Sequence, residues 1–202
     1  MRRGDYITTR SGIRFYVLDP RPEEIEIRDI AWALCRAVRW TAHCRDRYTV
    51  GDHSIIGARL ILEMSPLCEC TVDHIVCPPD EFCRAFCAFC FLLHDASETY
   101  LPDLARPIKH DPEFAFYRAT EQRLDKAIAQ RFGLPYPMLP EVKRMDYTML
   151  IAEGRDQMKL PAGDMLLYDQ PLAHHIPTIR PVRYARREFL RLFRQLQPRK
   201  AA

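Results

Sequence analysis

Four side chains of this sequence could together hold a metal ion. His53, the adjacent pair His94 and Asp95, and Asp146 lie far apart in the chain, on three segments that each have the pattern of a helix. Imidazole and carboxylate together suit a divalent metal of borderline to hard character, and packed helices can bring such side chains to one point. The residue types therefore predict a metal centre between helices. Taken singly, each has an ordinary alternative, a solvated histidine or a surface carboxylate.

The segment that carries His53 has a clear helix start. Thr49 and Asp52 have capping-box spacing, with a hydroxyl at the N-cap and a carboxylate three residues later. An apolar run over 55–64 follows. We therefore expect a helix that begins just before His53.

The other two segments place the remaining candidate ligands. Residues 85–93 are apolar on every face, which predicts a helix at the centre of the core. His94 and Asp95 follow where this run stops. Pro140 begins another amphipathic pattern, which carries Asp146.

The remaining pattern predicts an all-α fold, a bundle of six or seven helices with a small N-terminal β-hairpin. We expect one domain over 1–202, with the hairpin at 6–17, a metal-site core at 27–155 and a basic C-terminal helix at 182–197. Other expected elements are a helical stripe from Ile27 to Val38, a loop from Ser65 to Pro79, a helix from Asp111 to Gly133, a proline-rich stretch from Pro161 to Pro181 and a last helix from Tyr184 to Leu196.

Composition narrows the class of protein. The 202 residues are 48% hydrophobic and 28% charged, which is ordinary for a globular domain and excludes disorder, collagen and coiled coil. The net charge of +3 is too small for nucleic acid to be the main partner. No apolar stretch reaches the roughly 18–20 residues of a membrane span, and no secretory signal follows Met1. We expect a cytoplasmic protein, or one in the host cytoplasm if a phage encodes it.

The cysteines and the basic tail leave alternatives open. Thiols stay reduced in the cytosol. Cys68, Cys70 and Cys77 with His74 could form a structural zinc site, although the usual ligand pairs are absent. Three more cysteines, Cys83, Cys87 and Cys90, are expected to pack in the core. The arginine-rich stretch 183–200 is interpreted as a solvated helix face, with a subunit interface or a polyanion patch as the alternative.

The order of the candidate ligands resembles that of the HD-domain metal-dependent phosphohydrolases. The resemblance covers about residues 6–160 and extends beyond the ligands. Its segments are Thr8–Gly12, Leu18–Ile25, Asp29–Ala31, Arg39-Trp40, Tyr48–Val50, His53-Ser54, Leu92–Leu101, Asp103 and Pro107–Lys109. Within the family, the chain is similar to bacterial 5′-deoxynucleotidases and to phage dATP triphosphohydrolases.

The resemblance implies a role for each matching residue. His53, His94, Asp95 and Asp146 would hold one divalent ion, cobalt, zinc, manganese or magnesium. Glu98 would be the general acid/base, and Asp103 would position the water or protonate the leaving 5′ oxygen. The plain alternatives are a helix-surface carboxylate for Glu98 and a loop cap for Asp103.

Substrate-binding roles are implied for three further residues. Arg39 and Lys109 match phosphate-contacting positions, and surface charges are their alternative. Trp40 stands where many relatives carry phenylalanine. Its indole would either stack on a purine or pack in the core.

The resemblance implies cleavage of the P–O5′ bond of a deoxynucleotide. The foremost expectation is a dNTP triphosphohydrolase, acting on dATP above all, that releases deoxynucleoside and tripolyphosphate. The alternative reaction is that of a 5′-deoxynucleotidase on dNMPs. An alternative of another class, a non-catalytic regulatory or ligand-binding HD module, is disfavoured because no ligand or acid is missing. By analogy we expect a homo-oligomer, a dimer or hexamer.

Overall fold

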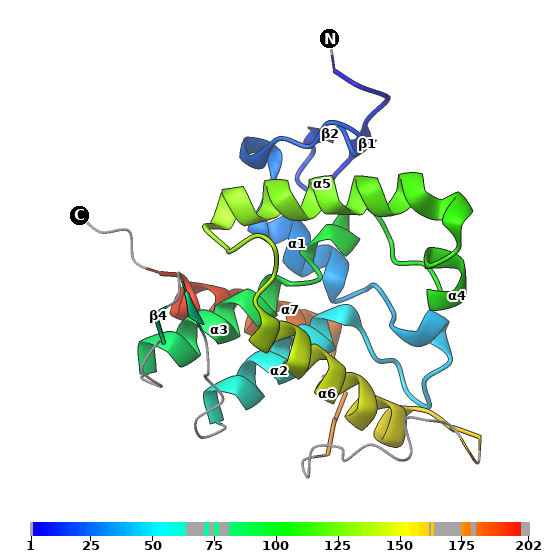
Figure 1. The fold of residues 1–202 in the computed structure, drawn as a ribbon, viewed down its shortest axis with the longest axis vertical. Coiled ribbons are helices and arrows are strands. Elements are labelled where there is room, and N and C mark those ends of the chain that lie inside the picture. Colours follow the sequence, from blue (N-terminus) through cyan, green and yellow to red (C-terminus); the bar gives the residue numbers. More distant parts are fainter. Residues whose placement is uncertain are drawn as a thin grey trace.

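The computed structural model describes residues 2–63, 71–72, 75–76, 81–161, 163, 175–178 and 181–198. This part of the chain is mainly helical (Figure 1), which confirms the predicted all-α class. Its α-helices are α1 (Ile27–Leu34), α2 (Val50–Glu63), α3 (Glu81–Leu93), α4 (Arg106–Lys109), α5 (Ala115–Phe132), α6 (Pro140–Gln157) and α7 (Val182–Leu196). None of the described helices is both long and apolar enough to span a bilayer.

Short strands and 3₁₀ turns complete the described structure. The predicted N-terminal hairpin is present, with β1 (Ile7–Thr8) antiparallel to β2 (Arg14–Phe15). A second antiparallel pair, β3 (Thr71–Val72) and β4 (Ile75–Val76), lies in the region expected to be only a loop. The 3₁₀ turns are η1 (Pro22–Glu24), η2 (Trp40–Ala42), η3 (Ala96–Thr99) and η4 (Pro112–Phe114).

The start of α2 follows from the predicted capping box. The Asp52 amide donates to Thr49 Oγ1 at 3.1 Å, and the Thr49 amide donates to Asp52 Oδ2 at 2.9 Å. Each side chain thus satisfies a backbone donor that the helix leaves free. The capping box fixes the first turn, and with it the position of His53.

Helices α2 and α3 pack closely in the core. Phe89 and Phe91 on α3 are fully buried, as predicted for a central helix. A Cβ atom at Gly57 of α2 would lie only 2.1 Å from Phe91 Cε1, so the glycine is required for this approach. Cys87 and Cys90 are buried on the same helix, in agreement with the predicted packing role.

Helix α5 packs against the turns η1 and η3, and α6 packs against α2 and α3. Asp111 caps the turn before α5 by accepting from the Glu113 amide at 2.9 Å, and Gly133 ends α5 at a φ of 69°. Both ends match the prediction. In Figure 1, α5 lies across α1, and the chain then turns back into α6.

The prediction that the first helix reaches Val38 is wrong. Helix α1 ends at Leu34, and Val38 instead forms an isolated antiparallel bridge with Thr49. The Arg39 amide continues this pairing by donating to Tyr48 O at 3.0 Å. Because the bridge joins segments distant in sequence, local helical spacing could not reveal it. Its effect is to bring Arg39 beside the start of α2.

Candidate metal centre

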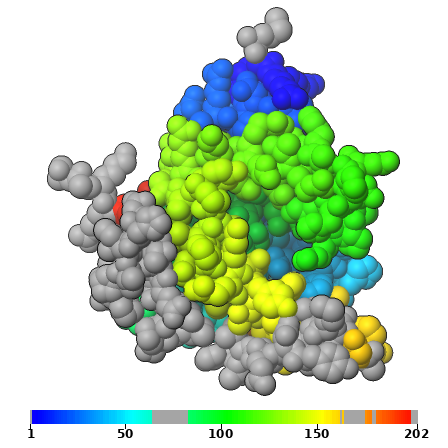
Figure 2. Space-filling view, in the orientation of Figure 1, coloured from blue at the N-terminus to red at the C-terminus, as the bar shows by residue number. Residues whose placement is uncertain are grey.

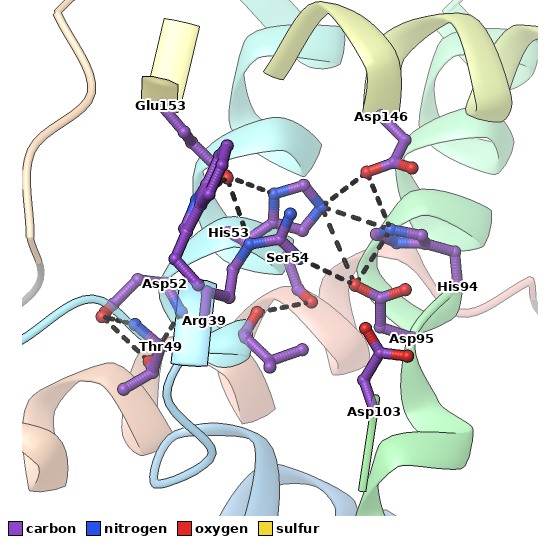
Figure 3. Close-up of polar contacts among 12 residues, drawn as sticks. Arg39, Thr49, Asp52, His53, Ser54, His94, Asp95, Asp103, Asp146 and Glu153 are labelled. Carbon is purple, nitrogen blue, oxygen red and sulfur yellow. Dashed lines mark hydrogen bonds and ion pairs between the residues drawn. The ribbon is translucent and has the colours of Figure 1, made fainter. Parts of the chain in front are cut away.

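Three segments bring the predicted ligands together (Figure 3). His53 lies in the first turns of α2 and is fully buried. His94 and Asp95 follow the last residue of α3, and Asp146 lies on α6. Among the described residues, His53, His94 and Asp146 form a cluster that could hold a metal ion.

The ligand atoms converge closely. His53 Nε2 lies 3.2 Å from His94 Nε2 and 3.2 Å from Asp146 Oδ1, and His94 Nε2 lies 3.6 Å from the same oxygen. Asp95 Oδ2 is 3.2 Å from His94 Nε2 and 3.9 Å from His53 Nε2. Atoms that bind one cation at about 2.1 Å are about 3.0–3.4 Å apart in octahedral or tetrahedral geometry. The spacing here is close to that range.

In both imidazoles, a hydrogen bond at Nδ1 orients the ring so that Nε2 points into the cluster. His53 Nδ1 lies 2.5 Å from Glu153 Oε1, and His94 Nδ1 lies 2.6 Å from the Phe91 carbonyl oxygen. An ionised carboxylate and a carbonyl only accept hydrogen bonds, so each Nδ1 must be the donor. In the neutral rings, both Nε2 atoms then carry lone pairs that face each other. This is the orientation that metal-binding histidines adopt.

The charged groups around the centre shift one another's pKa values. Burial opposes a charge on His94, but the carboxylates of Asp95 and Asp146 outweigh it and raise the pKa of His94 well above its usual value. Burial likewise opposes ionisation of Asp95, yet His94, His53 and Arg39 lower its pKa to about 2. The pKa of Asp146 is lowered by the same two imidazoles, again against burial. The two carboxylates therefore stay ionised and provide negative charge that a cation can neutralise.

Glu153, to which the sequence pattern gave no role, contacts His53 at Nδ1, the ring nitrogen that faces away from the other ligands. It is fully buried on α6, two helical turns after Asp146. Besides His53 Nδ1, its carboxylate accepts from Tyr48 Oη at 2.8 Å, Arg39 Nε at 3.1 Å and Trp40 Nε1 at 3.3 Å. A buried carboxylate with four donors is well compensated. Its only sequence signal was its place on the helical face of Asp146.

Arg39 and Trp40 lie in the site, but they already have protein partners. Arg39 is mostly buried and bridges Glu153 to Asp95, with Nη1 3.3 Å from Asp95 Oδ2. Trp40 begins a turn in which Trp40, Thr41 and Ala42 have φ angles of 54°, 51° and 64°. Non-glycine residues rarely adopt this left-handed region. The bond from the indole to Glu153 and the bridge at Arg39 fix this turn beside the centre.

Glu98 and Asp103 lie near Asp95. Burial, followed by the negative charges of Asp95 and Asp103, raises the pKa of Glu98 to about 9. Glu98 lies in η3, not in a continuation of α3, and its amide donates to Asp95 O at 3.0 Å. In Figure 3, Asp103 lies beside Asp95 with its carboxylate turned toward it.

Lys109 is held by two carboxylates. Its Nζ lies 2.7 Å from Asp103 Oδ1 and 2.7 Å from Glu121 Oε1. Lys109, which is predicted to contact phosphate, therefore already has its charge balanced by Asp103 and Glu121. The alternative zinc ligands of the sequence analysis, Cys68, Cys70, His74 and Cys77, lie outside the described residues.

Two bacterial proteins are similar in sequence to the chain. It is 32% identical over 151 residues to the uncharacterized protein YfdR of Escherichia coli K12, a match that covers 75% of this chain and 71% of YfdR. It is 33% identical over 136 residues to an uncharacterized protein of Rhodobacter capsulatus, a match over 66% of this chain and 61% of that protein. No protein-family model matches the chain.

Proposed function

The chain belongs to the same family as YfdR of Escherichia coli, and we propose that it is a metal-dependent phosphohydrolase of the HD-domain type that cleaves the P–O5′ bond of deoxynucleotides. The foremost substrate is a deoxynucleoside triphosphate, dATP above all, with deoxynucleoside and tripolyphosphate as products. A homo-oligomeric state is part of the same proposal.

One observation carries the metal part of this proposal. Two Nε2 atoms, each oriented as an acceptor by its own Nδ1 partner, face each other at 3.2 Å with two carboxylates beside them. Two such lone pairs cannot hydrogen-bond to each other while both rings are neutral. Either one ring is protonated, as the raised pKa of His94 favours without a cation, or a cation lies between them. His53, His94, Asp95 and Asp146 would hold that cation.

The remaining residues supply binding and proton transfer. When bound, a divalent cation would acidify a water molecule and offset negative charge on the phosphate. A water molecule attacks phosphorus and loses one proton to solvent, and the P–O5′ bond breaks. Glu98, protonated at neutral pH, donates a proton to the departing 5′ oxygen. Arg39 holds Asp95 in place and can contact a phosphate oxygen with its free donors.

Product analysis tests this function. The full-length protein is incubated with each dNTP and dNMP and with cobalt, manganese, zinc or magnesium, in water enriched in ¹⁸O. We expect deoxynucleoside and ¹⁸O-labelled tripolyphosphate, because attack at phosphorus leaves the solvent oxygen on the phosphate. Label in the nucleoside instead would contradict cleavage of the P–O5′ bond.

A matched pair of variants ties the reaction to the centre. His94→Ala removes one ligand, whereas His110→Ala removes an exposed histidine outside the cluster. We expect metal content by mass spectrometry and turnover to be lost only in His94→Ala. Metal bound by the wild type without hydrolysis of any nucleotide would favour a non-catalytic module and overturn the enzyme proposal.

The dNMP reaction is a second candidate because of the charge balance around the centre. Arg39 faces Asp95 and Glu153, and Lys109 faces Asp103 and Glu121. A monophosphate needs less compensating positive charge than a triphosphate. Orthophosphate released from dNMPs, with no tripolyphosphate from dNTPs, would support this second reaction against the first.

A further inference from the structure

A cavity of about 280 Å³ opens beside His94, between the end of α3, helix α5 and the segment that joins α5 to α6. Figure 2 shows the surface hollowed between α5 and α6. The cavity wall is mostly apolar, and its members come from all three elements: Leu93, Ile128, Ala129, Leu134, Met138 and Leu139. His94 belongs both to the cavity lining and to the metal cluster, so the cavity lies next to the centre.

The cavity also has a small number of polar groups. Asp125 and Gln122 lie one turn apart on α5, so both face the same side. Gln122 and Lys143 are exposed, whereas Asp125 is half-buried and accepts a hydrogen bond from Ser97. Asp125 is thus the acidic group set into an otherwise apolar wall.

The chemistry of Asp125 defines what it can bind. Burial, opposed by the hydrogen bond from Ser97 and assisted by the charge of Glu121, raises its pKa to about 6. At neutral pH the group is mainly a carboxylate, which accepts hydrogen bonds and donates none. The best partner for it inside an apolar cavity is therefore an N–H group on the ligand.

The size and walls of the cavity fit a flat aromatic ring. Small-molecule sites are mostly apolar with a few polar groups that fix orientation, and their volumes begin at about 300 Å³. Lys143 is the only lysine or arginine among the described residues that line the cavity, so the phosphate groups of a nucleotide would find little positive charge there. The apolar end of the nucleotide fits better, with its faces against the wall and one edge toward Asp125.

We propose that this cavity holds the nucleobase of the substrate and that Asp125 selects bases with an exocyclic amino group. The proposal rests on the proposed function, because it takes the phosphate end of the same nucleotide to lie at the metal centre. Carboxylates recognise exocyclic amino groups of bases in this way, as acceptors from the amine.

Binding of free nucleosides tests the cavity without any turnover. The two probes are 2′-deoxyadenosine and purine 2′-deoxyriboside, which lacks only the 6-amino group, measured by calorimetry on the metal-loaded full-length protein. We expect the wild type to bind deoxyadenosine about ten- to a hundredfold more tightly, the usual discrimination of one well-placed base contact. In Asp125→Ala this ratio should fall to about one.

The ratio separates base recognition from a structural role. Loss of the Ser97 bond or of local packing in Asp125→Ala would weaken both nucleosides alike and leave the ratio unchanged, which would overturn the proposal. Glu113→Ala, at an exposed carboxylate before α5, is the matched control and should keep the wild-type ratio.

The proposed function can fail independently of the cavity. If no nucleotide is hydrolysed but the nucleoside ratio behaves as expected, the base pocket stands and the reaction is wrong. If nucleotides are hydrolysed but the wild type binds both nucleosides equally, the reaction stands and the pocket assignment is wrong.

Discussion

Two glutamates next to the metal cluster, Glu153 and Glu98, have their pKa values shifted in opposite directions by their surroundings. Burial opposes ionisation of both. At Glu153 the neighbours His53 and Arg39 outweigh burial and lower the pKa. At Glu98 the neighbours Asp95 and Asp103 add to burial and raise the pKa to about 9. At neutral pH, Glu153 is therefore ionised and Glu98 is protonated.

The opposite pKa shifts of Glu153 and Glu98 suit the two residues to different roles in the proposed reaction. Glu153 accepts hydrogen bonds from four protein donors, one of which is His53 Nδ1, so it orients the His53 ring. Glu98, whose pKa is raised to about 9, is protonated at neutral pH, and it is the proton donor of the proposed reaction. Separated pKa values of neighbouring titratable groups are a general mark of acid and base assignments.

The largest expected effect is on the Glu98 side. Glu98→Gln keeps the shape of the side chain and removes the proton donor, so kcat should fall about 10²- to 10⁴-fold. Metal affinity, measured by calorimetry, should stay within a few-fold of the wild type. The control is Glu113→Gln, an exposed carboxylate before α5. Turnover retained by Glu98→Gln would remove the proton-donor role.

The next effect is on the Glu153 side. Glu153→Gln keeps an acceptor for His53 Nδ1 but removes the charge that fixes the tautomer, so metal affinity should fall about 10- to 100-fold. Glu141→Gln, on the same helix in an ion pair with the exposed Arg144 and outside the ligand cluster, should leave metal affinity unchanged. Equal affinities for the two variants would refute the positioning role of Glu153.

Much of the scaffold could be predicted from local sequence. The capping box at Thr49 and Asp52, the fully apolar run of α3 and the stop at Gly133 depend on neighbours within a turn or two, so periodicity and cap chemistry suffice. The convergence of His53, His94 and Asp146 was predicted from residue order and family resemblance, and their proximity is observed.

The supporting contacts could not be predicted in this way. The bridge between Val38 and Thr49 is not local, and the left-handed turn at Trp40 contradicts the preference of its residues. Glu153 is important because four donors from other segments converge on it, and no local pattern reports that. The balance of Lys109 by Asp103 and Glu121 likewise depends on tertiary packing.

A smaller effect concerns the stability of the fold, because the raised pKa of Glu98 makes the free energy of unfolding depend on pH. Glu98 ionises near its ordinary pKa in the unfolded chain but only near pH 9 in the fold. The unfolded state therefore loses this proton first, and stability falls as pH rises between these two values. Metal-free Glu98→Gln should melt higher than the wild type at pH 8, by about 2–4 °C for each kcal/mol recovered.

The pH dependence of this difference is the decisive measurement. At pH 4 both states of the wild type hold the proton, so the gain of Glu98→Gln over the wild type should shrink toward zero. Calorimetric scans from pH 4 to pH 8 with Glu113→Gln as control give the comparison. A gain that is constant with pH would show that Glu98 is not held protonated by its surroundings.

The smallest effect tests the Glu153 network at its periphery. Tyr48→Phe removes one of four donors to Glu153 and leaves the buried ring in place. A buried hydrogen bond to a charged group contributes about 1.5–3 kcal/mol, so the melting temperature should fall by several degrees. Because His53 Nδ1, Arg39 Nε and Trp40 Nε1 still bind Glu153, metal affinity should change by less than in Glu153→Gln.

Tyr184→Phe, at an exposed tyrosine, is the control. A loss of metal affinity in Tyr48→Phe as large as in Glu153→Gln would mean that the four donors act as one unit, and that the orientation of His53 depends on the whole network more than on its own bond to Glu153.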